Sequence, residues 1–146
     1  MKERFMDEAL KLALEAEKEG EVPVGAVVVC GGKIVGKGRN RREASQNALA
    51  HAEIEAINEA CSKIGYWRLN ESDLYVTLEP CPMCAGAAIN ARIRNVYAGV
   101  PDPKGGATGS VTDLFEMPFN HKPCLFFGMR EKECKDILQR FFTKLR

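Results

Sequence analysis

The sequence has no marked excess of charge of either sign. Its 146 residues include 21 lysines and arginines against 20 aspartates and glutamates, so the formal net charge is +1. A domain that binds nucleic acid through its overall charge usually shows a strong basic excess, and this composition excludes that mode of binding. Any nucleic-acid partner would therefore have to be held by a local basic patch.

Long apolar runs, internal repeats and low-complexity tracts are also missing. Residues 1–16 are charged and amphipathic, which excludes a secretory signal or a membrane span in this segment. No linker-like stretch divides the chain, and its length and 45% hydrophobic content suit one core. We therefore expect a single domain over residues 1–146 that is cytoplasmic and has no membrane partner.

Six cysteines are present, but no disulfide framework is indicated. Four of them lie in apolar or helical stretches, where a free thiol behaves as a small hydrophobic side chain. These four are Cys30, Cys61, Cys124 and Cys134. The remaining two belong to a motif that indicates chemistry.

The most informative pattern combines His51 and Glu53 with Cys81 and Cys84. An imidazole and two thiolates are good zinc ligands, whereas the carboxylate is better suited to carry a proton. Structural zinc sites normally have four Cys or His ligands, but hydrolytic sites have three and leave one position for water. The pattern therefore predicts a catalytic zinc site with one Zn²⁺ per chain. His51, Cys81 and Cys84 would be the ligands, and Glu53 the catalytic acid and base.

The spacing indicates that both halves of the motif lie at helix N-termini. Cys81 and Cys84 are three residues apart, on one side of a helical first turn, and Pro82 is favourable at the start of a helix. The backbone amides and the helix dipole at that end favour thiolates. Residues two apart in a regular helix point to opposite sides, so we expect His51 and Glu53 in a first turn, where the imidazole can reach back across the helix end.

Two other interpretations use the same cysteines. A Cys-x-x-Cys pair can be redox-active, but that chemistry does not need a His-x-Glu segment upstream. A closed structural zinc site would combine Cys81 and Cys84 with His121 and Cys124. This second arrangement leaves the His-x-Glu segment unexplained.

Hydrophobic periodicity predicts a layered α/β fold. The expected strands are residues 24–30, 33–38, 73–78, 95–100 and 125–127, and the expected helices are residues 5–16, 50–64, 82–92 and 131–145. Gly31 and Gly32 suit a tight turn between the first two strands. Strands that alternate with helices indicate parallel neighbours joined by crossover helices, which places both ligand-bearing helix starts at one edge of the sheet.

Beyond the motif, most of the chain resembles the bacterial tRNA-specific adenosine deaminase family. The similar stretches are GEVPVGAVVV at residues 20–29, KGRN ending at Asn40, AHAEIEAI, YWRLNESDLYVTLEPCPMCAGAAI, PDPKGGATGS at residues 101–110, FNH at residues 119–121, and Phe141-Phe142. General cytidine and guanine deaminases share the zinc motifs, whereas PDPKGGATGS and the phenylalanine pair look like the tRNA branch.

The resemblance implies a fold and an activity. The fold would be cytidine deaminase-like, a three-layer α-β-α arrangement with a central mixed five-stranded sheet. The activity would be zinc-dependent hydrolytic deamination of adenosine to inosine at the wobble position of a tRNA anticodon loop. The partners would be a tRNA anticodon stem-loop and a second copy of the chain. The apolar stretch 85–89 would serve the dimer contact or simply pack in the core.

The resemblance also assigns substrate-binding residues. It implies that Asn40 hydrogen-bonds the flipped adenosine. Glu21 and Val22 match positions that line the pocket and the groove for the RNA loop, as do Asp102 and Lys104 in the Gly-rich segment. Three of these residues also have an ordinary structural role open to them: Asn40 as a turn residue, Glu21 as an exposed charge and Lys104 as a solvated lysine.

Four basic residues are candidates for contacts to the RNA backbone: Arg41, Arg42, Lys144 and Arg146. Such residues are equally typical of a solvated surface. The alternative function is a free nucleobase or nucleoside deaminase acting on guanine, cytosine or adenosine, which shares the zinc centre but needs no basic rim. A zinc-stabilised binding module would instead need His121 and Cys124.

Overall fold

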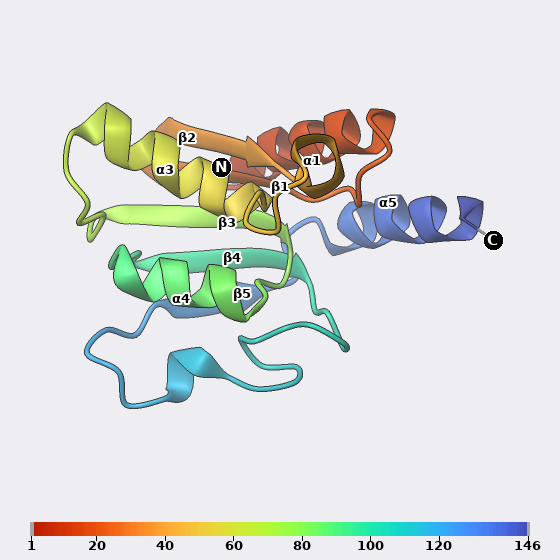
Figure 1. Cartoon of the computed structure of the whole chain (residues 1–146). Coiled ribbons are helices and arrows are strands. Elements are labelled where there is room, and N and C mark those ends of the chain that lie inside the picture. The colour runs from red at the N-terminus through yellow and green to blue at the C-terminus, as the bar shows by residue number, and fades with distance from the viewer. Residues whose placement is uncertain (1, 146) are drawn as a thin grey trace.

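Five strands form one mixed sheet at the centre of the computed structural model, which describes residues 2–145 (Figure 1). The strands are β1 (Gly25–Cys30), β2 (Lys33–Arg39), β3 (Ser72–Leu78), β4 (Asn95–Val100) and β5 (Cys124–Phe127). They lie in the order β2-β1-β3-β4-β5. The pairs of β1 with β2 and β3 are antiparallel, and β3, β4 and β5 are parallel. The predicted mixed five-stranded sheet is confirmed.

Helices cover both faces of the sheet and complete the predicted three layers (Figure 1). Helices α3 (Ala52–Ile64) and α4 (Pro82–Asn90) lie on one face. Helices α1 (Glu3–Lys18) and α5 (Glu131–Lys144) lie on the other. Within residues 2–145, no helix has the length and apolarity needed to cross a bilayer.

The alternation of side chains along each strand supplies both cores. Val28 and Val76 are buried beneath α3 and α4, whereas Val27 and Tyr75 are buried on the opposite face, with α1 and α5. Because both faces of β1 and β3 are covered, these strands are buried almost throughout. The central strands are therefore rigid supports for the segments that follow them.

Helix α3 packs unusually close to β2. A Cβ atom at Gly36 would lie 2.0 Å from the carbonyl oxygen of Ala56, and one at Gly38 would lie 2.1 Å from that of Ala52. The alanines of α3 that face the sheet are fully buried. The glycines of β2 and the alanines of α3 thus fix the position of the helix on the sheet. Because His51 directly precedes α3, its position is fixed with the helix.

Some element boundaries differ from the prediction. The helix expected from residue 50 begins at Ala52, with His51 as its N-cap. Two short elements were not predicted, α2 (Arg42–Ser45) and a 3₁₀ turn, η1 (Leu114–Glu116). Helix α2 has no buried residue, so hydrophobic periodicity contains no signal for it.

We predict that Gly38→Ala lowers the free energy of unfolding by about 1–3 kcal/mol, because the added methyl group must displace the α3 backbone. Urea denaturation followed by circular dichroism measures the change. Gly86→Ala in α4 is the control, since a Cβ atom there meets nothing within 4 Å. Equal stability of the two variants would show that the packing of α3 on β2 is looser than described.

Candidate active site

The structure brings His51, Cys81 and Cys84 together at the starts of two helices. His51 and Cys81 are the N-caps of α3 and α4, and Cys84 lies in the first turn of α4. The Nδ1 atom of His51 is 3.6 Å from the Sγ atom of each cysteine. All three ligand atoms lie within 4.8 Å of one another.

These separations fit a tetrahedral metal ion. With metal bonds of about 2.3 Å to sulfur and about 2.0 Å to nitrogen, the nitrogen-to-sulfur edge of a tetrahedron is about 3.5 Å. Among residues 2–145, no other group of three or more His, Cys, Asp or Glu side chains has a comparable arrangement. The donor set of one imidazole and two thiols, with a fourth direction open, therefore suits a divalent metal ion in a reactive site.

The closed site with His121 and Cys124 is not formed. Cys81 and Cys84 follow the carboxyl end of β3, whereas Cys124 begins β5 opposite Asn95, the first residue of β4. His121 is held by a bond of 2.7 Å between its Nε2 and the carbonyl oxygen of Ile93. The two pairs of residues lie at opposite edges of the parallel part of the sheet, so they cannot share one metal.

The electrostatics of the cluster show that its members compete for protons. A hydrogen bond with Cys84 lowers the pKa of Cys81 to about 4, and His51 adds to this effect. The same thiol contact, together with burial, raises the pKa of Cys84. A hydrogen bond with Cys81 also raises the pKa of His51. A divalent cation would replace the shared protons, because metal ligands bind in their deprotonated forms.

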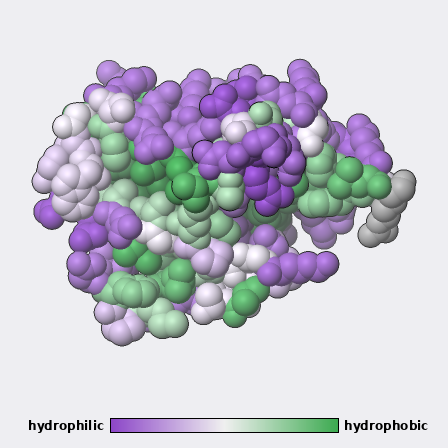
Figure 2. Space-filling view, viewed as in Figure 1, coloured by the Kyte–Doolittle hydropathy of each residue, from purple (hydrophilic) through white to green (hydrophobic). Residues whose placement is uncertain are grey.

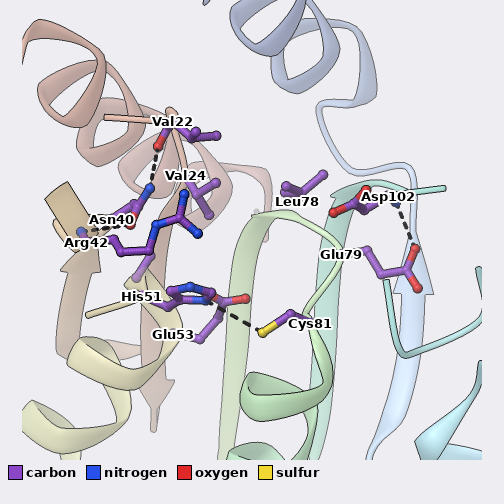
Figure 3. A pocket seen from close by; sticks show the side chains of 11 residues that line it. Val22, Val24, Asn40, Arg42, His51, Glu53, Leu78, Glu79, Cys81 and Asp102 are labelled. Carbon is purple, nitrogen blue, oxygen red and sulfur yellow. Dashed lines mark hydrogen bonds between the residues drawn. The ribbon is translucent and has the colours of Figure 1, made fainter. Parts of the chain in front are cut away.

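Glu53 is the acidic member of the site. It lies in the first turn of α3 and is only 4% exposed, and burial raises its pKa to about 7. The extended backbone of His51, with φ of −88° and ψ of 153°, turns the imidazole out of the helical direction. This is the arrangement expected from the sequence, and both side chains point into one pocket (Figure 3).

The pocket is framed by segments that follow or precede the central strands. Its volume is about 190 Å³, below the range of roughly 300–1,000 Å³ that is usual for ligand pockets. A space of this size suits a single ring system, with the remainder of a larger ligand outside. The lining residues are Val22, Val24, Asn40, Arg42, His51, Ala52, Glu53, Leu78, Glu79, Cys81 and Asp102 (Figure 3).

Comparison with known proteins identifies the family. The family model of MafB19-like deaminases matches residues 1–146. A tRNA-specific adenosine deaminase of Bacillus subtilis (strain 168) is 49% identical, over 99% of this chain and 90% of that protein. One of Agrobacterium fabrum is 46% identical, over 97% of this chain and 94% of that protein. The chain belongs to the tRNA-specific adenosine deaminase family.

A solved structure supports the same placement of this deaminase. It comes from a study of A-to-I editing by tRNA:A34 deaminases at the wobble position of transfer RNA. The two structures superpose with a TM-score of 0.90 at 46% identity, over 92% of this chain and 99% of the other. The agreement confirms the cytidine deaminase-like fold expected from the sequence.

Three of the predicted substrate-binding residues line the pocket of the deaminase, namely Val22, Asn40 and Asp102. Asn40 donates from Nδ2 to the carbonyl oxygen of Val22 at 3.2 Å, and its Oδ1 accepts from the amide of Arg42 at 3.2 Å. Asp102 lies on the opposite wall. Lys104 does not line the pocket; it is exposed on the same loop, and its backbone amide donates to Asp102 Oδ1 at 3.2 Å.

Glu21 does not line the pocket, contrary to the prediction. Its side chain is only 1% exposed and lies behind α2, where its carboxylate accepts from the backbone amides of Glu43 at 3.1 Å and Ala44 at 2.6 Å. Buried acidic groups need such donors, and the exposed α2 needs an anchor. Glu21 therefore holds the short helix whose first residue, Arg42, faces the pocket.

Glu79 is a pocket residue that the sequence reasoning missed. It is 3% exposed and follows β3 directly, and its carboxylate accepts from the amides of Asp102, Thr108 and Ser110. Burial opposes the ionised form, but the hydroxyl of Ser110 and these amides together lower the pKa of Glu79. A glutamate directly after a buried strand and next to a metal motif was the available signal.

The predicted basic residues differ in their surroundings. Arg41 is paired with Glu55, with 2.9 Å between Nε and the carboxylate. Arg42 lines the pocket with its side chain 52% exposed, and its ion pair with Glu43 is long at 3.8 Å. Lys144 is exposed at the end of α5, and Arg146 lies outside the described residues.

We predict that Glu21→Gln loosens α2, because the variant has only one uncharged oxygen left for two backbone amides and turns an NH₂ group toward the other donor. Hydrogen exchange at the amides of Glu43 and Ala44 should accelerate by roughly tenfold or more. The control is Glu116→Gln, a surface substitution that changes the net charge equally. Unchanged exchange at both amides would contradict the anchoring role of Glu21.

Proposed function

We propose that this deaminase hydrolyses adenosine to inosine at the wobble position of a tRNA anticodon loop, using one zinc ion per chain. The observation that carries the proposal is the three-ligand cluster of His51, Cys81 and Cys84 beside the buried Glu53, at the base of a pocket sized for one base. Relatives of nearly half identical sequence are tRNA-specific adenosine deaminases, which supports the assignment of the substrate.

The donor set agrees with zinc in a hydrolytic role. His51, Cys81 and Cys84 would hold the ion and leave one coordination position without a protein ligand. Bound zinc supplies a water acidic enough to act as a nucleophile near neutral pH. The chain's own contribution is to place an adenine ring and a proton carrier beside that position.

Glu53 would move the protons. Its carboxylate lies in the same pocket as the ligands and is shielded from bulk solvent. It would accept a proton from the attacking water and deliver it to the adjacent ring nitrogen of adenine, then assist departure of the amine. The balance is one adenosine and one water converted to one inosine and one ammonia.

Asn40 and the valines of the pocket would hold the base. Asn40 is already fixed by its bonds to Val22 and Arg42, which leaves one amide N–H of its side chain free to point at the adenosine. Val22 and Val24 form an apolar wall, and Asp102 lies across from them (Figure 3). A small pocket of this kind accepts a base that is flipped out of its stack, while the phosphates stay outside.

Arginine and lysine side chains near the rim would contact the RNA backbone. Arg42 has the strongest support because its half-exposed guanidinium borders both the pocket and the solvent. Arg41, Lys104 and Lys144 are further candidates, although Arg41 already has Glu55 as a partner. Arg146 stays a sequence-based candidate. Phosphate contacts of this kind position a nucleic acid and weaken with salt.

We also infer that the deaminase functions as a homodimer in the cytoplasm. The dimer is supported by an apolar groove between α3 and α4, lined by Ile54, Ile57, Trp67 and Ala87 among others. Trp67 is 49% exposed there, and hydrophobic residues gather over these helices (Figure 2). Of the stretch 85–89, the side chains at 85, 88 and 89 are buried in the core, so the rest of the groove would carry the contact.

We predict that Glu53→Gln abolishes deamination of an anticodon stem-loop transcript, lowering kcat by at least about 100-fold, because the proton carrier is lost. Metal analysis should still find one zinc ion per chain. Cys84→Ser is the matched variant, and it should lose zinc and activity together. Turnover by Glu53→Gln at the wild-type rate would eliminate the mechanism.

Free adenosine, cytidine and guanine serve as competing substrates in the same assay. The wild-type protein should deaminate the stem-loop and act only weakly on the free compounds, because the pocket holds the base alone and the rim supplies much of the binding. Comparable turnover of a free compound would instead support the alternative activity on nucleobases or nucleosides.

We predict that Arg42→Ala raises KM for the stem-loop several-fold and lowers the slope of log KM against log salt by about one counterion, with zinc content unchanged. Lys63→Ala is the control, because Lys63 is exposed in the last turn of α3, away from the helix start. An unaltered salt slope in Arg42→Ala would exclude a phosphate contact by this residue.

A further inference from the structure

Glu79 accepts four hydrogen bonds from the Gly-rich loop, residues 101–110. Its Oε1 accepts from the amide of Asp102 at 2.9 Å and from the hydroxyl of Ser110, and its Oε2 accepts from the amides of Thr108 at 3.0 Å and Ser110 at 3.1 Å. The donors come from both ends of the loop. The buried carboxylate of Glu79 thus holds both ends of the loop by hydrogen bonds.

The loop leaves no room for a side chain at its centre. A Cβ atom at Gly106 would lie 2.2 Å from the carboxyl carbon of Glu79 and 2.4 Å from each of its oxygens. A side chain at this position would push the Glu79 carboxylate out of its place under the loop. The geometry of Gly106 is independent of the hydrogen bonds and indicates the same contact.

The part of the loop nearest the pocket is folded onto Asp102. The Oδ1 atom of Asp102 accepts from the amides of Lys104 and Gly105, each at 3.2 Å, and its carbonyl oxygen accepts from the amide of Gly106 at 2.9 Å. The amide of Asp102 is itself held by Glu79. A movement at Glu79 would therefore displace Asp102 and the exposed Lys104 together.

The same anchor is attached to the metal-binding helix. Glu79 is followed directly by Pro80 and Cys81, and the carbonyl oxygen of Pro80 accepts from the amide of Ala107 at 2.9 Å. These contacts fix the position of the loop relative to the cluster of metal ligands. This relation is needed if the loop is to hold an RNA strand while its base lies at the metal.

We propose that Glu79 is a positioning residue for substrate binding, whose carboxylate fixes the Gly-rich loop so that Asp102 closes the pocket wall and Lys104 stands at its rim. It acts through the loop and makes no contact with the reacting atoms. The proposal rests on the proposed function, because the substrate whose binding it supports is the anticodon loop.

The main variant is Glu79→Gln, which keeps the shape of the side chain but turns an amide NH₂ toward a set of N–H and O–H donors. We expect the exchange of the Asp102, Thr108 and Ser110 amides to accelerate, and KM for the anticodon stem-loop to rise by about tenfold, the usual effect of losing a hydrogen bond to a charged group. The value of kcat at saturation and the zinc content should stay near those of the wild type.

Three further variants make the test specific. Gly106→Ala should reproduce the rise in KM, because its methyl group displaces the same carboxylate. Ser110→Ala removes one donor and should give a smaller effect that is not additive with Glu79→Gln. Glu71→Gln, an exposed glutamate that precedes β3, is the charge-matched control and should change none of these quantities.

The readouts separate the two proposals. Hydrogen exchange and zinc content need no substrate, so they test the loop anchor even if the wild-type protein fails to deaminate the stem-loop. Unchanged exchange of the three amides in Glu79→Gln overturns the inference, as does a fall in kcat with loss of zinc at unaltered KM. If Glu79→Gln does not fold, Ser110→Ala provides the test instead. Unaltered hydrogen exchange and unaltered KM in that variant would also overturn the inference.

Discussion

The close packing of α3 against β2 is the constraint on which the site depends. Glycines at 36 and 38 let the helix backbone approach the strand, and the buried alanines of α3 keep it there. His51 immediately precedes that helix, whereas Cys81 and Cys84 begin a helix that follows β3. The meeting of an imidazole and two thiols at one point is therefore decided by how two helices are placed on one sheet, and only the side-chain chemistry is local.

Two walls of the pocket are held by buried carboxylates rather than by hydrophobic packing. On one side, α2 is a four-residue helix, and on the other, residues 101–110 are largely irregular. Neither has a hydrophobic face large enough to fix it. A buried carboxylate holds each one through its backbone amides, Glu21 for α2 and Glu79 for the Gly-rich loop. The surfaces that would meet the substrate can thus vary in sequence while their main chains keep their positions.

The sequence predicted the parts of the site that are encoded in short spacings. The Cys-x-x-Cys and His-x-Glu segments each span an N-cap and a first turn, and periodicity located the helices that carry them. It could not identify the partners of Glu21 and Glu79, which lie 22 to 31 residues away and are reached only after folding. The family resemblance assigned Glu21 to the pocket lining, and the sequence held no sign of the backbone amides that bury its carboxylate. Likewise, the rejection of His121 and Cys124 required knowing at which edge of the sheet each residue lies.

The helices α3 and α4 both begin without a side-chain cap, since their N-cap positions are occupied by His51 and Cys81. An ordinary Ser, Thr, Asp or Asn at such a position would contribute about 1 kcal/mol to holding the helix end. The chain forgoes this local support at two positions 30 residues apart, and the proposed zinc ion would instead hold both helix ends. Removal of the ion would then loosen the first turns of both helices at the same time. Activity and the local stability of that edge of the sheet would therefore be lost together.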